Sequence, residues 1–367
     1  MHFLKVSAAL VLSLTAFVSA APTPSVFITA EKDLTALWNG PMYQQYISST
    51  NGTTLGMPRA DGGAVNLPWR YYPSLAKETK NTIILTNGRA ETVGKFREFI
   101  YDLSQNGFNV LTWDHRGQGF APRLGCQPTT LSDVEDFNEG YVGDMQKIIT
   151  DNKKSGLIAG HNLLFWGHSM GGGIGVGHMQ KFPGTFAAAV LSAPMLEINT
   201  DPYPGIVALP IADIIEAFGG PCAAAPGQNP VPGPVQDPNL GGVTTSAIRF
   251  TLSRQIYTQF PNALLGGSTA RWVSEAISAI QAYVLKAKYT TTPIQLHQAA
   301  LDTYVNDNGQ NVFCKGLKVL GVTVIKPAPK CQLIRHEAAK HEIWAEVDSI
   351  RTPYMNTIIA YFRQFSV

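Results

Sequence analysis

A serine between glycines has the sequence context of a catalytic nucleophile. The pentapeptide GHSMG at residues 167–171 follows four apolar residues, 163–166, and precedes a glycine-rich segment that can form a helix. The glycines allow a strained strand-to-helix turn, which exposes the hydroxyl beside the free N–H groups of a helix N-terminus. An ordinary strand-to-helix turn is the alternative. We interpret the pattern as a nucleophilic Ser169.

A serine hydroxyl becomes a strong nucleophile only when a histidine accepts its proton and a carboxylate orients that histidine. In hydrolases with this turn, the acid and then the histidine follow the serine in the chain. Asp302 follows a predicted strand, with Asp307 as the alternative in the same loop. His341 precedes the closing helix, with His336 as its competitor. A helix-capping Asp302 and a surface His341 are the non-catalytic alternatives. The sequence thus predicts Ser169, Asp302 and His341 as catalytic residues.

Hydrolysis at such a serine also needs two donors for the negatively charged oxygen of the intermediate. We expect them to be the backbone N–H of Met170 and that of Arg89, in the loop after an apolar strand at 82–86. This chemistry requires no metal or organic cofactor. The other histidines considered have weaker claims to a role in proton transfer: His115, His161, His168 and His178.

Predicted strands and helices alternate along most of the chain. Strands are expected at 62–72, 82–86, 108–113, 163–166, 187–191 and 293–298, with a last one at 322–325 or 332–335. Amphipathic helices are expected near 96–103, 137–149, 170–182, 308–316 and 354–362. Residues 21–60 lack a clear pattern and are expected to wrap the surface. Alternating elements predict an α/β fold with a mostly parallel sheet covered by helices on both faces, and ligands of such sheets bind at the carboxyl edge.

The alternation breaks between about residues 194 and 292. Residues 204–218 are almost wholly apolar, residues 219–243 are rich in Gly and Pro, and two helices are expected at 245–258 and 271–287. We interpret the segment 194–291 as an inserted helical cap over the strand ends. Its apolar helix either faces an acyl chain or a lipid surface as a lid, or packs against the body of the protein.

The N-terminus has the pattern of a secretory signal peptide. Lys5 precedes an apolar run at 6–17, and small residues at 18–20 indicate cleavage after Ala20. That run is too short to cross a bilayer as a helix, and no later apolar stretch is long enough. We therefore expect a secreted chain without a transmembrane segment. Its predicted parts are a signal peptide at 1–20, a core at 21–193 and 292–367, and a cap at 194–291.

Four cysteines suit two disulfides in an oxidising compartment. Three connectivities are possible. We favour Cys314–Cys331, which closes a short loop, and Cys126–Cys222, which would tie the cap to the core. Asn51 begins the single N-glycosylation sequon. The net charge of +2, with 15% charged residues, gives no polybasic patch for a nucleic-acid partner.

These segments together resemble the lysophospholipase and monoacylglycerol lipase branch of the α/β-hydrolases, which is sometimes grouped with serine aminopeptidases. The resemblance runs from about residue 60 to the end and rests on NGRAE at 87–91, DHRGQG at 114–119, GHSMGG at 167–172, QAALD at 298–302 and HE at 341–342. Within the branch, the chain is most similar to bacterial-type lysophospholipases. It departs from monoacylglycerol lipases at Asn87, where those enzymes usually carry a histidine.

The resemblance implies hydrolysis of carboxylic esters through an acyl-enzyme on Ser169. The implied substrate is a single-chain lipid, either a lysophospholipid or a monoacylglycerol, with transient contact of the cap with a lipid interface. The guanidinium of Arg89 is a candidate contact for a substrate phosphate. Two alternatives remain. A serine aminopeptidase or general esterase is the first, and the aminopeptidase would use cap carboxylates such as Asp213 and Glu216 to hold an amine. A catalytically silent lipid-binding protein is the second, and it would lack one of the three catalytic residues.

Overall fold

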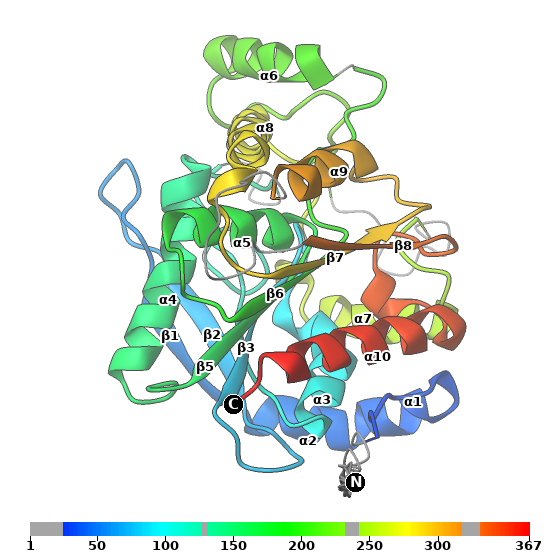
Figure 1. Cartoon of the computed structure of the whole chain (residues 1–367). Helices are drawn as coiled ribbons and strands as arrows, with labels where there is room; N and C mark the ends of the chain where they lie inside the picture. Colours follow the sequence, from blue (N-terminus) through cyan, green and yellow to red (C-terminus); the bar gives the residue numbers. More distant parts are fainter. Residues whose placement is uncertain (1–24, 127–130, 204, 232–241, 318–330) are drawn as a thin grey trace, which may run out of the picture.

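The computed structural model describes residues 25–126, 131–203, 205–231, 242–317 and 331–367. Its centre is an eight-stranded sheet with the order β1-β2-β4-β3-β5-β6-β7-β8 (Figure 1). The strands are β1 (Thr50–Leu55), β2 (Asn66–Tyr72), β3 (Asn81–Thr86), β4 (Asn109–Trp113), β5 (Asn162–His168), β6 (Ala188–Ser192), β7 (Ile294–Ala299) and β8 (Cys331–His336). The six strands from β4 to β8 in this order run parallel to one another. The strand β2 pairs antiparallel with both of its neighbours, β1 and β4. The predicted α/β class with a mostly parallel sheet is confirmed.

Helices cover both faces of this sheet (Figure 1). The helices are α1 (Glu31–Asn39), α2 (Pro41–Ser48), α3 (Arg97–Gln105), α4 (Gly143–Lys154), α5 (Met170–Lys181), α6 (Gly205–Gly219), α7 (Ala247–Gln259), α8 (Ala270–Leu285), α9 (Asp307–Gly316) and α10 (Asp348–Gln364). One apolar cluster joins the sheet to α4, α5 and α8, and a second joins it to α3 and α10. Because both faces are buried, every residue of β3, β4 and β6 is buried, which explains why these strands are largely apolar rather than alternating.

The N-terminal part of the chain has regular structure that its sequence pattern does not indicate. Residues 21–60 lack a clear pattern and were expected to wrap the surface, and the described part of this range forms α1, α2 and β1. Leu34, Trp38 and Met42 pack into a small core with Tyr101 of α3. The two helices are short and stabilised by this packing rather than by a long periodic pattern, so their sequence signal is weak. The strand β1 is polar because it lies at the sheet edge.

Two expected strands need adjustment. The strand predicted at 62–72 begins only at Asn66, since the preceding residues form the turn that reverses the chain from β1 to β2. Of the two positions considered for the last strand, 332–335 lies within β8 and is confirmed, whereas 322–325 lies outside the described residues.

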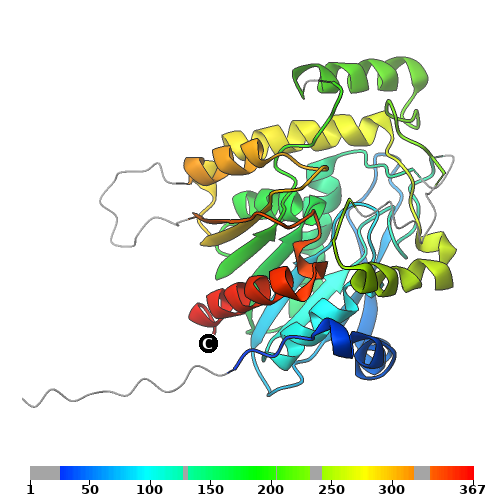
Figure 2. The same cartoon turned by 90° about the vertical axis from the view of Figure 1, so that its right-hand side faces the viewer.

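The segment inserted between β6 and β7 lies on both sides of the carboxyl edge of the sheet. In both views α6 lies on α8, which packs on α5, while α7 lies near α1 and α10 (Figures 1 and 2). Ala208 and Ala212 of α6 are buried, but Ile214 and Phe218 are exposed, Phe218 to 90%. The apolar helix therefore packs against the body with one side and presents apolar residues to solvent with another. In the described part of the chain, no helix is both long and apolar enough to cross a bilayer.

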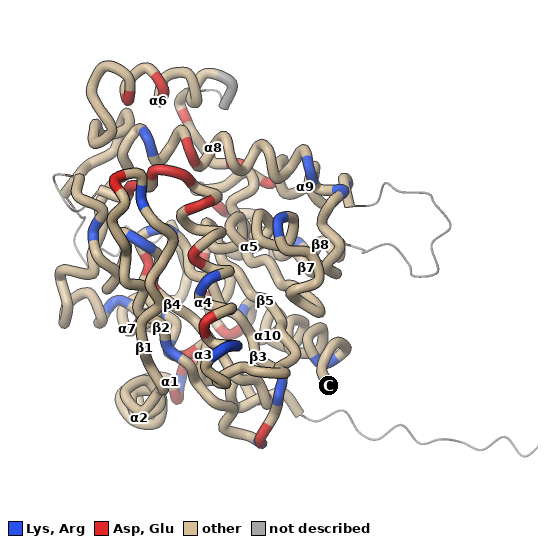
Figure 3. The backbone as a smooth tube through the Cα atoms, turned by 90° about the vertical axis from the view of Figure 1, so that its left-hand side faces the viewer, with Lys and Arg blue, Asp and Glu red and all other residues tan. Residues whose placement is uncertain are grey.

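Both favoured disulfide pairings are present. Cys126, in the loop after β4, is bonded to Cys222 of the insertion, and Cys314 of α9 is bonded to Cys331 of β8. On the face drawn in Figure 3, Lys and Arg residues are interspersed with Asp and Glu along the backbone.

Candidate active site

The backbone at Ser169 has the conformation that the glycine pattern predicts. Ser169 lies between β5 and α5 with φ +51° and ψ −122°, in a region that non-glycine residues rarely adopt. A Cβ at position 171 would lie 2.5 Å from the carbonyl oxygen of Thr86, so only glycine fits there. A Cβ at Gly167 would lie 2.9 Å from the carbonyl oxygen of Gly171. The tight turn thus holds the serine hydroxyl at the carboxyl edge of the sheet.

The structure brings the three predicted catalytic residues together. The Oγ atom of Ser169 lies 2.9 Å from Nε2 of His341, and Nδ1 of the same ring lies 2.6 Å from Oδ2 of Asp302. Since an ionised carboxylate only accepts hydrogen bonds, Nδ1 donates to Asp302 and Nε2 is left to accept the proton of the serine hydroxyl. This is the arrangement in which a histidine acts as the base for a serine nucleophile.

Asp302 is held in its ionised form by its surroundings. Burial alone would raise its pKa, but the hydrogen bond from His341 and the backbone N–H groups of Tyr304 and Val305 outweigh that effect and lower the pKa. These N–H groups donate to Oδ1 at 2.8 Å and 3.2 Å. The carboxylate can therefore stabilise positive charge on the ring of His341.

The two alternative residues lie elsewhere. Asp307, at the start of α9, forms an ion pair with Arg335. His336 contacts Nδ1 of His297 through its Nε2 at 2.9 Å. Neither has a hydrogen bond to Ser169 in the described structure.

Two of the remaining histidines, His168 and His115, are buried. His168 is buried, with its ring 4.7 Å from that of His341, and its Nδ1 lies 3.2 Å from the carbonyl oxygen of Ser192. Burial lowers the pKa of His168 and that of His115 to about 4. A neutral ring behind His341 fits the expected packing role.

Two backbone N–H groups near Ser169 are free to bind a negatively charged oxygen. Arg89 lies in the loop after β3, and this loop touches the serine, because a Cβ added at Gly88 would lie 3.2 Å from the Cβ of Ser169. Met170 is the first residue of α5, where an N–H has no partner inside the helix. Within the described residues, neither N–H donates a hydrogen bond. The predicted pair of donors is thus available.

Ser169 and His341 line a cavity of about 450 Å³. The insertion contributes much of its wall, with apolar and aromatic residues that include Val243, Tyr257, Leu264, Leu265, Trp272 and Val273. The loop after β7 adds Thr303, Tyr304 and Val305. The cavity therefore combines an apolar wall with polar and charged groups near the nucleophile, which suits an ester that has both a hydrocarbon and a polar part.

A buried ion cluster in the cavity wall was not predicted from the sequence. The ammonium group of Lys95 lies 2.5 Å from Glu91 and 2.5 Å from Glu342. Burial would raise the pKa of Glu342, but Lys95 and Arg254 outweigh that effect and lower it to about 2. The spacing of Glu91 and Lys95 by four residues was the available signal. Their partner Glu342 is distant in sequence, so the pattern alone could not identify it.

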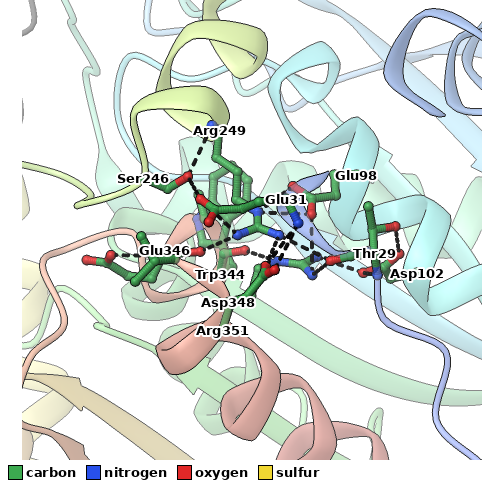
Figure 4. A network of polar contacts seen from close by, with 12 residues as sticks. Thr29, Glu31, Glu98, Asp102, Ser246, Arg249, Trp344, Glu346, Asp348 and Arg351 are labelled. Carbon is green, nitrogen blue, oxygen red and sulfur yellow. Dashed lines mark hydrogen bonds and ion pairs between the residues drawn. The ribbon is translucent and has the colours of Figure 1, made fainter. Parts of the chain in front are cut away.

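A second ion network holds the loop that carries His341 (Figure 4). Arg249 of α7 donates to the backbone oxygen of Glu346 at 2.7 Å, and Arg351 of α10 donates to that of Trp344 at 2.8 Å. Both arginines are fully buried, and Glu98 of α3 pairs with both of them. Rigid support of this kind keeps the histidine at a fixed distance from the serine.

Known proteins match this chain in sequence. Residues 77–348 match the family described as Serine aminopeptidase, S33. Lysophospholipase L2 of Escherichia coli is 30% identical over 306 residues, which cover 82% of this chain and 86% of that protein. A monoacylglycerol lipase of Mycolicibacterium smegmatis is 29% identical over 136 residues, which cover 36% of this chain and 44% of that protein.

Solved structures agree with the fold. A soluble variant of monoglyceride lipase from Saccharomyces cerevisiae, in complex with a substrate analog, has a TM-score of 0.63. It is 18% identical and covers 87% of this chain and 96% of its own. The expected α/β-hydrolase fold and the resemblance to bacterial-type lysophospholipases are both confirmed. The chain therefore belongs to the serine aminopeptidase S33 family and is a serine ester hydrolase.

Proposed function

We propose that this protein hydrolyses the ester bond of single-chain lipids, lysophospholipids or monoacylglycerols, through an acyl-enzyme on Ser169. The observation that carries the proposal is the chain of two hydrogen bonds from Ser169 through His341 to Asp302, at 2.9 Å and 2.6 Å, beside a cavity with an apolar wall from the insertion. The names of the related lysophospholipases and monoacylglycerol lipases support the same substrate class.

In the proposed mechanism, Ser169 attacks the ester carbonyl carbon while His341 accepts the hydroxyl proton. The backbone N–H groups of Arg89 and Met170 bind the oxygen that becomes negatively charged. His341 then protonates the leaving alcohol, which leaves the acyl group on Ser169. A water molecule next gives its proton to His341 and attacks the acyl carbon, which releases the fatty acid and restores the serine. Asp302 stabilises the positively charged ring of His341 during both acylation and deacylation of Ser169.

An aminopeptidase is the less favoured candidate. Its substrate has a free amine, which would need an available carboxylate in the cavity. Asp213 and Glu216 of the insertion do not line the cavity, and Asp213 accepts a hydrogen bond from Ser274. Glu91 and Glu342 do line it, but Lys95 already pairs with both.

The position of Arg89 also bears on the substrate. Arg89 lines the cavity, but its Nη1 donates to the Oγ of Ser132 at 3.1 Å and to the carbonyl oxygen of Gly266 at 2.9 Å. This side chain thus ties the core to the insertion, and a phosphate contact would have to use its other nitrogens.

A fluorophosphonate probe tests whether Ser169 is a nucleophile. We expect labelling of the purified protein that is abolished in Ser169→Ala and retained in Ser48→Ala, which removes an exposed helical hydroxyl. A folded protein that takes up no label would support the lipid-binding alternative instead. Comparing lysophosphatidylcholine, monoacylglycerol and an aminoacyl anilide then tests the substrate, and a preference for the anilide would overturn the lipid assignment.

Secretion is a separate part of the proposal. It is supported by the signal-peptide pattern at 1–20 and by two disulfides, which form in oxidising compartments. Residues 1–24 lie outside the described structure. Expression of the full chain in a secreting host should give extracellular protein that begins at Ala21 on N-terminal sequencing. Retention of an uncleaved chain inside the cell would contradict the proposal.

A further inference from the structure

The loop after β3 is held by side chains at the residues on either side of Arg89. The N–H of Gly88 donates to Oε2 of Glu91 at 2.5 Å, and the N–H of Ala90 donates to Oε1 of Gln118 at 2.7 Å. The N–H of Arg89 between them has no partner in the described part of the chain. The hydrogen bonds of this loop therefore use the two neighbouring N–H groups and leave that of Arg89 for a ligand.

Gln118 reaches this loop from another one. It follows β4 as part of the DHRGQG motif at 114–119, and its side chain is fully buried. A backbone N–H can only donate, so the contact with Ala90 fixes the amide of Gln118 with its oxygen toward Ala90. The amide nitrogen Nε2 donates to the hydroxyl oxygen of Tyr141 at 3.1 Å and lies 3.6 Å from Sδ of Met170. One amide thus contacts the neighbour of one expected oxyanion donor and the side chain of the other.

A buried tyrosine holds the amide of Gln118 in this orientation. The hydroxyl oxygen of Tyr141 also accepts from Nε1 of Trp272 at 3.1 Å, and its own proton points to the carbonyl oxygen of Asp133 at 3.5 Å. If the amide of Gln118 turned over, its nitrogen would face the N–H of Ala90, and two donors would oppose each other. The side chain of Gln118 therefore has one favourable orientation.

The backbone of Ala90 needs such support. Its φ of +60° lies in the left-handed region, which residues other than glycine adopt only where surrounding contacts hold them there. Ala90 has two such contacts: its N–H donates to Gln118, and its carbonyl oxygen accepts from the hydroxyl of Tyr257 at 3.0 Å. Without the contact to Gln118, Ala90 can relax toward a common φ value, which would reorient the adjoining N–H of Arg89.

We propose that Gln118 is a positioning residue for the oxyanion site, because it fixes the direction of the N–H of Arg89. The inference rests on the proposed ester hydrolysis and adds the residue on which the geometry of one donor depends. Gln118 is not among the described residues that line the cavity, so it acts through Ala90 and Met170 rather than on the substrate. Oxyanion donors bind a charge that is absent from the bound ester. A displaced donor should therefore slow the reaction without weakening substrate binding.

Gln118→Met tests this inference, because methionine has nearly the same length and offers Ala90 no amide oxygen. We expect kcat for p-nitrophenyl butyrate to fall about 10–100-fold, while KM stays within about threefold. Gln45→Met is the matched control, since Gln45 of α2 is also buried and hydrogen-bonds Ser104 of α3 instead. This control should alter neither constant. An unchanged kcat in a folded Gln118→Met protein would overturn the proposal.

A trifluoromethyl ketone supplies a readout of the oxyanion site itself. Ser169 adds to its carbonyl carbon while the hydroxyl proton passes to His341, and the adduct carries a negative charge on the former carbonyl oxygen. In Gln118→Met, the inhibition constant of this ketone should rise by roughly the factor by which kcat/KM falls, and in Gln45→Met it should stay the same. A lower kcat with an unchanged inhibition constant would mean that Gln118 does not act through the oxyanion site.

Gln118→Asn is a second variant, for use if Gln118→Met does not fold. It keeps a neutral amide on a side chain one methylene shorter, which cannot contact both Ala90 and Tyr141. We expect kcat to fall at least about fivefold at an unchanged KM, with circular dichroism to compare the folded states. A kcat equal to that of the unchanged protein would count against the role of Gln118. Failure of the unchanged protein to hydrolyse the butyrate ester would instead refute the proposed function.

Discussion

The ammonium group of Lys95 lies 2.5 Å from a carboxylate oxygen of Glu342, the residue that directly follows His341. The same ammonium group lies 2.5 Å from Glu91, in the loop that supplies Arg89. All three charged side chains are at least nine-tenths buried. One ion cluster thus joins the loop with the expected oxyanion donor to the loop with the expected base.

Removing Lys95 should destabilise the fold strongly, because two carboxylates would stay buried without their main partner. We expect Lys95→Met to lower the free energy of unfolding by about 3–5 kcal/mol, measured by urea titration. Lys147→Met is the matched control, since Lys147 is 36% exposed and its ion pair with Asp151 contributes less than about 1 kcal/mol. Equal losses in the two variants would contradict a special role for the cluster.

Asp302 and Asp307 were both candidates for the catalytic acid, and the activities of their asparagine variants should distinguish them. Asp302→Asn keeps the shape but removes the negative charge beside Nδ1 of His341, so we expect kcat to fall on the order of 10⁴-fold. Asp307→Asn disturbs only an ion pair with Arg335 and should retain activity within about threefold. Ester hydrolysis by the two purified variants, with circular dichroism to check folding, measures the difference. Comparable activity losses would refute the assignment.

The residues that come together at the active site could be predicted because local geometry and chain order constrain them. The turn at Ser169 needs glycines at fixed positions, and these are visible in the sequence. The acid and the histidine then had to lie after the last parallel strands, which left two candidates for each. Position in the chain favoured Asp302 and His341, and the contacts in the structure separate them from Asp307 and His336.

What the sequence could not predict depends on contacts between distant segments. The edge strand β1 is polar and lacks the alternation of apolar residues that indicates a strand. It is recognised as a strand only by its backbone pairing with β2. The pair of Lys95 with Glu342 joins residues 247 positions apart. The insertion was expected as one cap, yet its helices pack on different sides of the site. Such arrangements follow from tertiary packing rather than from local periodicity.

Buried neutral histidines should make the stability depend on pH. Burial lowers the pKa of His178 from 6.5 to about 3. Between these two values, the unfolded chain binds a proton at this residue and the folded chain does not. The contribution of His178 to the free energy of unfolding is therefore fully present above about pH 6.5 and is lost as the pH falls below that value. From about pH 7.5 to about pH 5, this one residue should cost about 2 kcal/mol.

His178→Gln removes that titration and isolates its effect. His178 is in α5, and its Nε2 contacts the Oε1 of Gln146 at 2.8 Å. The free energy of unfolding of the unchanged protein should fall by about 2 kcal/mol more than that of the variant between the two pH values. Parallel pH profiles for the two proteins would show that His178 does not titrate on unfolding.

The two disulfides should contribute unequally, because they restrict the unfolded chain to different degrees. Cys126–Cys222 joins residues 96 positions apart and Cys314–Cys331 joins residues 17 apart. In the chain-entropy model, replacing both cysteines of the first pair by serine should cost about 4–5 kcal/mol, and of the second about 3 kcal/mol. Chemical denaturation of the two double variants measures both losses. A larger loss for the shorter loop would mean that contacts in the folded state, rather than restriction of the unfolded chain, dominate the contribution of these bonds.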